Sequence, residues 1–232
     1  MSAQRARLIC APLVSNSTLF SSPPSASSPS TTASSSSPSS STASAAAAAA
    51  ASSFLTQWTA IVNDIVAQSS AMLNRRIAAT ASSSATVNEQ VTAALETRAL
   101  LAKLDKRCGD LTVAIQLLRR VDSQLAVLVD SDAAAAIASG AMLENAQSEP
   151  YVFPGCTLTR LALMVREVTA MFVRQYALVV SSVDLLQGTS DREQGTVILS
   201  AMLHQPYINE KTVTLLLGWI RDAITTESRA VA

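Results

Sequence analysis

Apolar side chains recur every three or four residues through most of the chain beyond residue 53, which is the spacing of one face of an α-helix. The first run predicts a helix over about 54–80, and the small residues at 81–85 end it. Thr86 stands three residues before Glu89, the arrangement of a capping box, so a second helix is expected to begin there. The apolar face of the first helix is formed by Leu55, Trp58, Ile61, Ile65, Met72 and Ile77.

The strictest repeat runs from residue 101 to residue 129 in alternating steps of three and four, which is a heptad pattern. Glycine costs a helix interior about 1 kcal/mol, so we expect either a bend at Gly109 or two abutting helices. The repeat predicts an antiparallel pair within the chain or, as the alternative, a coiled coil between chains. We favour the first because further helices follow that need a partner. The positions are Leu101, Leu104, Cys108, Leu111, Ile115, Leu118, Asp122, Leu125 and Val129.

Two more helical regions follow a connection at 140–155, whose apolar triplet at 151–153 is expected to pack against the bundle. One helix is predicted over about 157–187, with Gly188 as its left-handed cap. The last region, about 192–227, is broken by Pro206. Its second half presents Val213, Leu216, Leu217, Ile220 and Ile224. The stripe of the 157–187 helix is Leu161, Val165, Val168, Phe172, Val179, Val183 and Leu186.

No β-branched alternation bounded by turns occurs anywhere in the sequence. The predicted fold class is therefore all-α: a helical bundle of antiparallel, coiled-coil-like helices. From residue 15 to residue 53 the chain is nearly all Ser, Ala, Pro and Thr, which offers too little apolar surface to offset the entropy of ordering. We therefore expect a disordered Ser/Ala-rich, low-complexity tail over 1–53 and a helical domain over 54–228.

The N-terminal composition also bears on localisation. No acidic residue precedes Asp64, serine is abundant, and Arg5 and Arg7 lie near the start, as in organellar transit peptides. The tract has no amphipathic pattern, however, so the nucleus or cytoplasm is the expected location, with a mitochondrion or plastid as the alternative.

Charge and reactive residues argue against several function classes. Seventeen basic and seventeen acidic residues give zero formal charge, whereas nucleic-acid-binding domains carry a basic excess. Direct nucleic-acid binding is therefore expected to be weak or absent, and the basic residues between Arg98 and Arg120 are interpreted as a solvated helix face. The longest apolar stretch, around 161–183, is interrupted by charges, so no transmembrane segment is predicted.

Candidate chemistry is sparse. The six glycines are too dispersed for a phosphate-binding loop, and the single histidine, His204, is expected to be a surface or capping residue. A zinc site needs about four clustered ligands, which three scattered cysteines do not supply; these are Cys10, Cys108 and Cys156. Their odd count suggests a reducing compartment. We therefore expect no enzyme activity and no catalytic, cofactor-binding or metal-binding residues.

One segment carries a family resemblance. The sequence Tyr151-Val152-Phe153-Pro154, followed by the block from Met164 to Phe172, is similar to the Val-x-Glu-Val-Thr-x-x-Phe core of the "required for excision 1-B" DNA repair domain family. Residues 111–226 would correspond to that domain, although Gly195 and Pro206 interrupt a region that is one continuous helix in the family. The resemblance implies a small helical factor in DNA excision repair without catalytic residues.

Two of the matched positions, Glu167 and Thr169, flank the apolar stripe and are the predicted partner contacts. The sequence therefore predicts a non-catalytic helical interaction protein that binds other proteins through helical surfaces, as an accessory factor in DNA excision repair. The alternatives are a coiled-coil structural or scaffold subunit of a cytoskeletal or trafficking complex, and an organellar assembly factor. Association with a second copy of the chain stays open.

Overall fold

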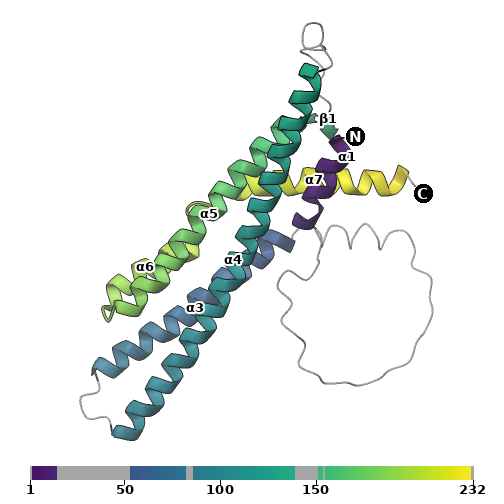
Figure 1. Ribbon diagram of the computed structural model, residues 1–232. Coiled ribbons are helices and arrows are strands. Elements are labelled where there is room, and N and C mark those ends of the chain that lie inside the picture. The colour runs from purple at the N-terminus through teal and green to yellow at the C-terminus, as the bar shows by residue number, and fades with distance from the viewer. Residues whose placement is uncertain (1, 15–52, 82–85, 139–150, 154, 231–232) are drawn as a thin grey trace, which may run out of the picture.

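The computed structural model describes residues 2–14, 53–81, 86–138, 151–153 and 155–230. In this part of the chain six α-helices, one 3₁₀ turn and one short hairpin are formed, so the all-α prediction is confirmed. The main body consists of elongated helices packed along their lengths (Figure 1): α3 (Ser53–Ala81), α4 (Val87–Ala138), α5 (Leu158–Gly188) and α6 (Arg192–His204). At one end of this body lie α7 (Glu210–Ala230), α1 (Ser2–Cys10) and the 3₁₀ turn η1 (Ala11–Leu13).

The heptad seam lies on α4, a single helix of 52 residues that passes through Gly109 without a break. Its central seam positions are buried, and α4 packs against both α3 and α5. The seam is thus used within the chain, as the preferred interpretation predicts. At the start of the helix the backbone N–H of Thr86 donates to Glu89 Oε2 at 2.8 Å, which is one half of the expected capping box.

An aromatic cluster joins α3 to α5. Phe172 has 0% of its surface exposed, and its ring meets Phe54 and Trp58 edge to face at centroid distances of 5.2 Å and 4.8 Å. The indole N–H of Trp58 donates to Oε1 of Gln205 at 3.0 Å, which connects the cluster to the end of α6. The prediction that Phe172 belongs to the core is confirmed.

The ends of α5 and α6 differ in part from expectation. All seven predicted stripe residues of α5 are buried, and the break at Pro206 is confirmed because α6 ends at His204 and α7 begins at Glu210. The predicted left-handed cap at Gly188 is wrong. After Gly188 the chain is extended, and the N–H of Thr189 donates to the Leu185 carbonyl at 3.2 Å. The left-handed residue is Gln205 instead, with φ of 46°.

The connection before α5 contains a small hairpin. Strand β1 (Tyr151–Phe153) pairs antiparallel with β2 (Cys156–Thr157), and Gly155 supplies the positive φ of 76° between them. Val152 is buried against the body, as expected for this triplet, whereas Tyr151 is exposed. This hairpin was not predicted, because a strand of three residues is too short to show an alternating pattern.

The N-terminal prediction needs a correction for residues 2–14. Within the predicted disordered tail 1–53, α1 and η1 are ordered and bury Ala6, Cys10, Leu13 and Val14. These positions are spaced by four, three and one residues, which is one face of a helix. The composition of the long Ser/Ala tract concealed this short amphipathic segment. Residues 15–52, for which disorder was also predicted, lie outside the described residues.

Candidate functional site

Two surfaces of α4 are the candidate functional sites, and the first is a groove shared with α5. The groove has a volume of about 280 Å³. Apolar side chains form its walls, and two carboxylates, Asp105 and Asp184, stand at its border with one cysteine. Its lining residues are Leu101, Leu104, Asp105 and Cys108 from α4 and Val180, Val183, Asp184 and Gln187 from α5.

The electrostatics of this groove keep its cysteine unreactive. Burial raises the pKa of the Cys108 thiol, and the negative charges of Asp105 and Asp184 raise the pKa further. The thiolate, which is the nucleophilic form, is therefore scarce at neutral pH. Among the described residues no group of three or more His, Cys, Asp or Glu side chains is placed to hold a metal ion. The groove suits contact with a side chain better than covalent chemistry.

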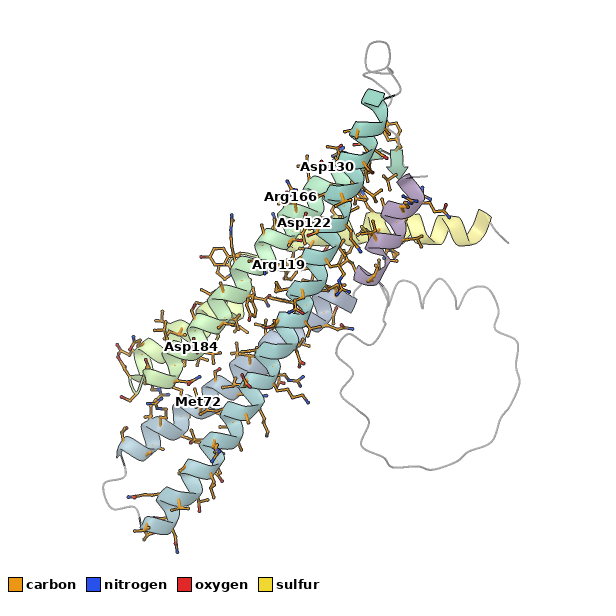
Figure 2. The ribbon with its side chains drawn as sticks, viewed as in Figure 1. Met72, Arg119, Asp122, Asp130, Arg166 and Asp184 are labelled. Atoms are coloured by element: carbon orange, nitrogen blue, oxygen red, sulfur yellow. The ribbon has the colours of Figure 1, made fainter. Side chains whose placement is uncertain are left out.

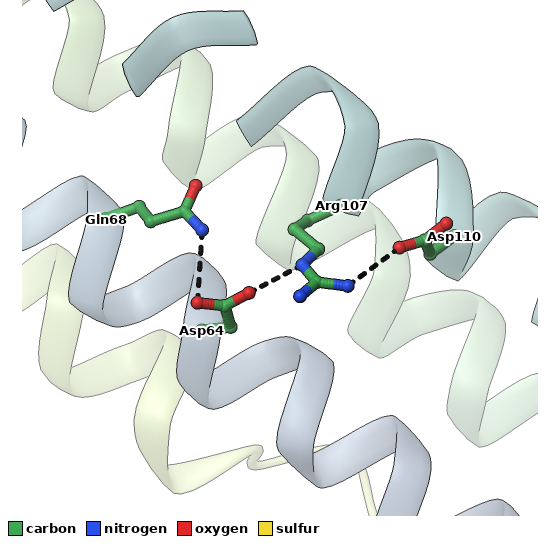
Figure 3. A network of polar contacts seen from close by, with 4 residues as sticks. All are labelled: Asp64, Gln68, Arg107 and Asp110. Atoms are coloured by element: carbon green, nitrogen blue, oxygen red, sulfur yellow. Dashed lines mark hydrogen bonds and ion pairs between the residues drawn. The ribbon is translucent and has the colours of Figure 1, made fainter. Parts of the chain in front are cut away.

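A polar network crosses from α3 to α4 just beyond the groove (Figure 3). Arg107 donates through Nε to Asp64 at 2.5 Å and through Nη1 to Asp110 at 3.2 Å, while Gln68 donates to the other oxygen of Asp64 at 3.1 Å. Partial burial lowers the pKa of Arg107, but the hydrogen bonds and charges of Asp110 and Asp64 outweigh it and raise the pKa overall. These side chains are about one-third exposed, so each ion pair contributes only about 0–1 kcal/mol. The network joins α3 to α4 at the border of their buried side chains.

The second surface is the outer face of the first third of α4. Val87, Val91 and Leu95 are 75%, 53% and 63% exposed, and their spacing of four residues places them on one face of the helix. Arg98 is exposed on the same face. On another side of the helix, Glu96 pairs with Arg75 of α3 at 3.2 Å, which leaves the apolar face turned away from α3. We call Val87, Val91 and Leu95 the α4 stripe.

The two predicted contact residues differ in their exposure. Glu167 is exposed, but Thr169 is only 6% exposed and its hydroxyl has no hydrogen-bond partner among the described residues. Arg166, the residue before Glu167, reaches Asp122 of α4 at 3.7 Å, where α4 and α5 run side by side (Figure 2). A partner contact through Thr169 therefore conflicts with its burial, and Glu167 alone keeps that prediction.

Two other sequence-based expectations concern His204 and α5. His204 is the last residue of α6 and is exposed, as expected for a surface histidine.

By length and composition α5 is apolar enough to cross a membrane, with a mean hydropathy of 1.2 over its most apolar window. Its buried stripe packs within the bundle, and a core helix has the same composition.

No protein-family model matches this chain, and no curated protein matches it. The resemblance to the excision-repair family therefore stays a prediction from the sequence.

The α4 stripe was not predicted from the sequence. Its signal was the step of four residues from Val87 to Val91 to Leu95, immediately before the heptad seam. Periodicity shows that such residues share a face, but it does not show whether another element covers them.

Proposed function

We propose that this chain is a non-catalytic helical interaction protein that binds a partner helix along the α4 stripe. The observation that carries the proposal is the exposure of Val87, Val91 and Leu95 in one row. Fully burying one such side chain is worth about 1.5–3 kcal/mol. Partner helices dock through side chains at this spacing, so the stripe offers enough apolar surface for recognition.

The charge beside the stripe indicates the chemistry of the partner. Arg98 follows Leu95 by three residues and Val91 by seven, so it continues the same face. It is exposed, and no ion pair is recorded for it among the described residues. An amphipathic partner helix with an acidic side chain at this end would pair with Arg98 while its apolar face covers the stripe.

The excision-repair role extends this proposal through the resemblance at 151–172. Such a factor would act by binding repair proteins, because the zero formal charge of the chain disfavours strong contact with phosphates. In the scaffold alternative, an intermolecular coiled coil would use the α4 stripe, since the 101–129 seam packs against α3 and α5. The organellar alternative still rests on the acid-free N-terminus.

The test is affinity purification of the tagged full chain with quantitative mass spectrometry, comparing the wild type with Val91→Glu/Leu95→Glu. Val127→Glu is the matched control, because Val127 lies on the same helix and is 67% exposed. We expect a set of partners to be lost with the double variant and kept with the control. Equal recovery from all three proteins would contradict the proposal. The identity of the lost partners would separate a repair complex from a cytoskeletal, trafficking or organellar one.

The repair role has its own test. Cells lacking the gene should be sensitive to DNA damage that is handled by excision, and the purified protein should bind duplex DNA weakly and in a salt-dependent way. Normal damage tolerance in a clean deletion would remove the repair role but leave the helix-binding proposal standing.

A further inference from the structure

The N-terminal segment, residues 2–14, packs one apolar face against the body. It packs against α4, β1 and α7 (Figure 1). Its four buried hydrophobic side chains are two small ones, Ala6 and Cys10, and two aliphatic ones, Leu13 and Val14. Leu8, on the opposite face, is 68% exposed. The segment is thus an amphipathic helical peptide that packs its apolar face on α4, β1 and α7.

One polar contact fixes the position of this segment. The guanidinium of Arg7 donates through Nε and Nη2 to the carbonyl oxygen of Val152, at 2.9 Å and 2.6 Å. Within the described residues β1 pairs with β2 alone, so this carbonyl is satisfied by a side chain instead of a second strand. A charged donor makes this a stronger hydrogen bond than a neutral one would. Arg5, two residues earlier, is exposed.

The sequence separates this segment from α3 by residues 15–52, which number 38. Ser, Ala, Pro and Thr make up nearly all of them, a composition that predicts no core. A tether of this kind holds a ligand near its site at an effective concentration on the order of millimolar. Binding of residues 2–14 to the body is then an intramolecular equilibrium, which a competing peptide can shift.

We propose that the surface formed by α4, β1 and α7 is a peptide-binding site, occupied in cis by residues 2–14, and that an amphipathic helical peptide of a partner displaces them. The pattern of the resident segment defines the partner peptide. It has two small residues four positions apart, as Ala6 and Cys10 are, and an arginine directly after the first of them. Two aliphatic residues stand seven and eight positions after that first small residue, as Leu13 and Val14 do. This site is separate from the α4 stripe and does not depend on it.

The experiment uses the full chain with a site-specific protease sequence inserted within residues 15–52. The probe is a fluorescently labelled synthetic peptide of residues 2–14, and its binding is followed by anisotropy. Before cleavage the resident segment competes with the labelled peptide for the site. The labelled peptide should therefore bind the uncleaved protein at least about tenfold more weakly than it binds the cleaved protein from which the fragment has been removed by dilution. Circular dichroism should show that the cleaved body keeps its helices.

Two peptide variants test the role of Arg7. Arg7→Ala should weaken binding to the cleaved protein by about tenfold or more, because it removes a charged hydrogen bond. Arg5→Ala, the matched control, should bind like the unmodified peptide. The proposal is overturned if the fragment stays bound despite dilution and excess peptide, if the body unfolds when the fragment leaves, or if the cleaved, folded body does not bind the peptide. The Val91→Glu/Leu95→Glu variant should bind the peptide normally, which separates failure here from failure of the proposed function.

Discussion

The two ends of the molecule are held together by different means. The bundle of α3 to α6 buries large side chains, including Trp58, Ile65, Leu111 and Phe172, and its aromatic rings interlock. The end built from α1, η1, the hairpin and α7 buries aliphatic side chains such as Leu13 and Ile220, and individual polar contacts join its elements. Arg7 bonds to the Val152 carbonyl, and the guanidinium of Arg160 lies 5.3 Å from the ring centroid of Trp219.

This difference indicates which part carries stability and which part is able to open. Large buried side chains are costly to remove because each leaves a cavity that its neighbours fill only partly. A small apolar contact held by a few polar groups opens at a lower free energy, and elements that move are drawn from such regions. We therefore expect substitutions in the bundle to unfold the whole protein and substitutions at the other end to act locally.

The largest effect is expected for Phe172→Ala in the bundle. Phe172 is fully buried between Phe54 and Trp58, so the substitution should lower the free energy of unfolding by about 3–5 kcal/mol. Urea denaturation followed by circular dichroism measures this, and Phe172→Leu should cost less. A loss below about 1 kcal/mol for the alanine variant would mean that the aromatic cluster does not hold the bundle.

A smaller effect on stability is expected when glycine is replaced by alanine, and its sign should differ between Gly195 and Gly109. A Cβ atom at Gly195 of α6 would overlap the side chain of Leu73 on α3, whereas a Cβ at Gly109 of α4 meets nothing within 4 Å. Gly195→Ala should therefore destabilise the bundle by about 1–3 kcal/mol through overpacking. Gly109→Ala should stabilise it by about 0.5–1 kcal/mol, because alanine favours the helix interior.

Thermal unfolding of the two variants beside the wild type measures this pair. Equal shifts of the two melting temperatures would show that the packing of α3 on α6 is looser than the contact at Leu73 indicates. Combining Gly195→Ala with Leu73→Val should recover part of the loss, because valine is shorter at the point of overlap.

Local periodicity predicted the bundle well, as the buried stripe from Leu161 to Leu186 shows. It failed where a position depends on distant partners. Thr169 flanks the stripe in sequence but faces the interior, and Gln205 takes a left-handed backbone where its side chain accepts a hydrogen bond from Trp58. Residues 2–14 were missed because four apolar positions were averaged with a long Ser/Ala tract.

The candidate sites were less predictable than the core. Heptad spacing placed Leu101, Leu104 and Cys108 on one seam, but it did not show that α5 brings Asp184 beside Asp105 to form a groove. The apolar character of Val87, Val91 and Leu95 is visible in the sequence, yet only the packing of the other helices leaves them exposed. Exposure is a property of the whole fold, which local spacing does not contain.

At the other end of the molecule we expect an alkaline transition confined to α1. Burial, together with the neighbouring Cys156, raises the pKa of Cys10 from 9.0 to about 12. The folded form therefore holds this proton more tightly than the unfolded form. The contribution to stability is complete below about pH 9 and is lost as pH rises towards 12. Because Cys10 lies in the N-terminal segment, α1 should separate before the bundle unfolds.

A donor–acceptor dye pair at the exposed positions Leu8 and Tyr151, attached without cysteine chemistry, measures this separation. Energy transfer should fall above about pH 9 while the circular dichroism of the bundle is retained. Cys10→Ala should shift the loss of transfer to higher pH, whereas Cys108→Ala, in the groove between α4 and α5, should not. Simultaneous loss of both signals would show that the two ends form one cooperative unit.

The smallest effect is expected at the first turn of α4, when the pH falls below the ordinary pKa of a glutamate. The hydrogen bonds from Thr86, the backbone N–H first, hold the pKa of Glu89 below its ordinary value of 4.5. The carboxylate therefore stabilises the folded helix start above about pH 4.5, and this contribution is lost as pH falls through the lower pKa of the folded state. The amide resonance of Thr86 should report the loss by nuclear magnetic resonance. Glu89→Gln should remove the pH dependence because glutamine does not ionise, and it should keep the helix start because a glutamine also completes a capping box. Resonances around Phe172 should stay constant over the same pH range. We expect this because the exposed first turn of α4 is only weakly coupled to the aromatic cluster, whereas the rings of the cluster contact one another. If they moved with Thr86, the exposed third of α4 that bears the stripe would be part of the bundle's cooperative core and not a surface that extends from it.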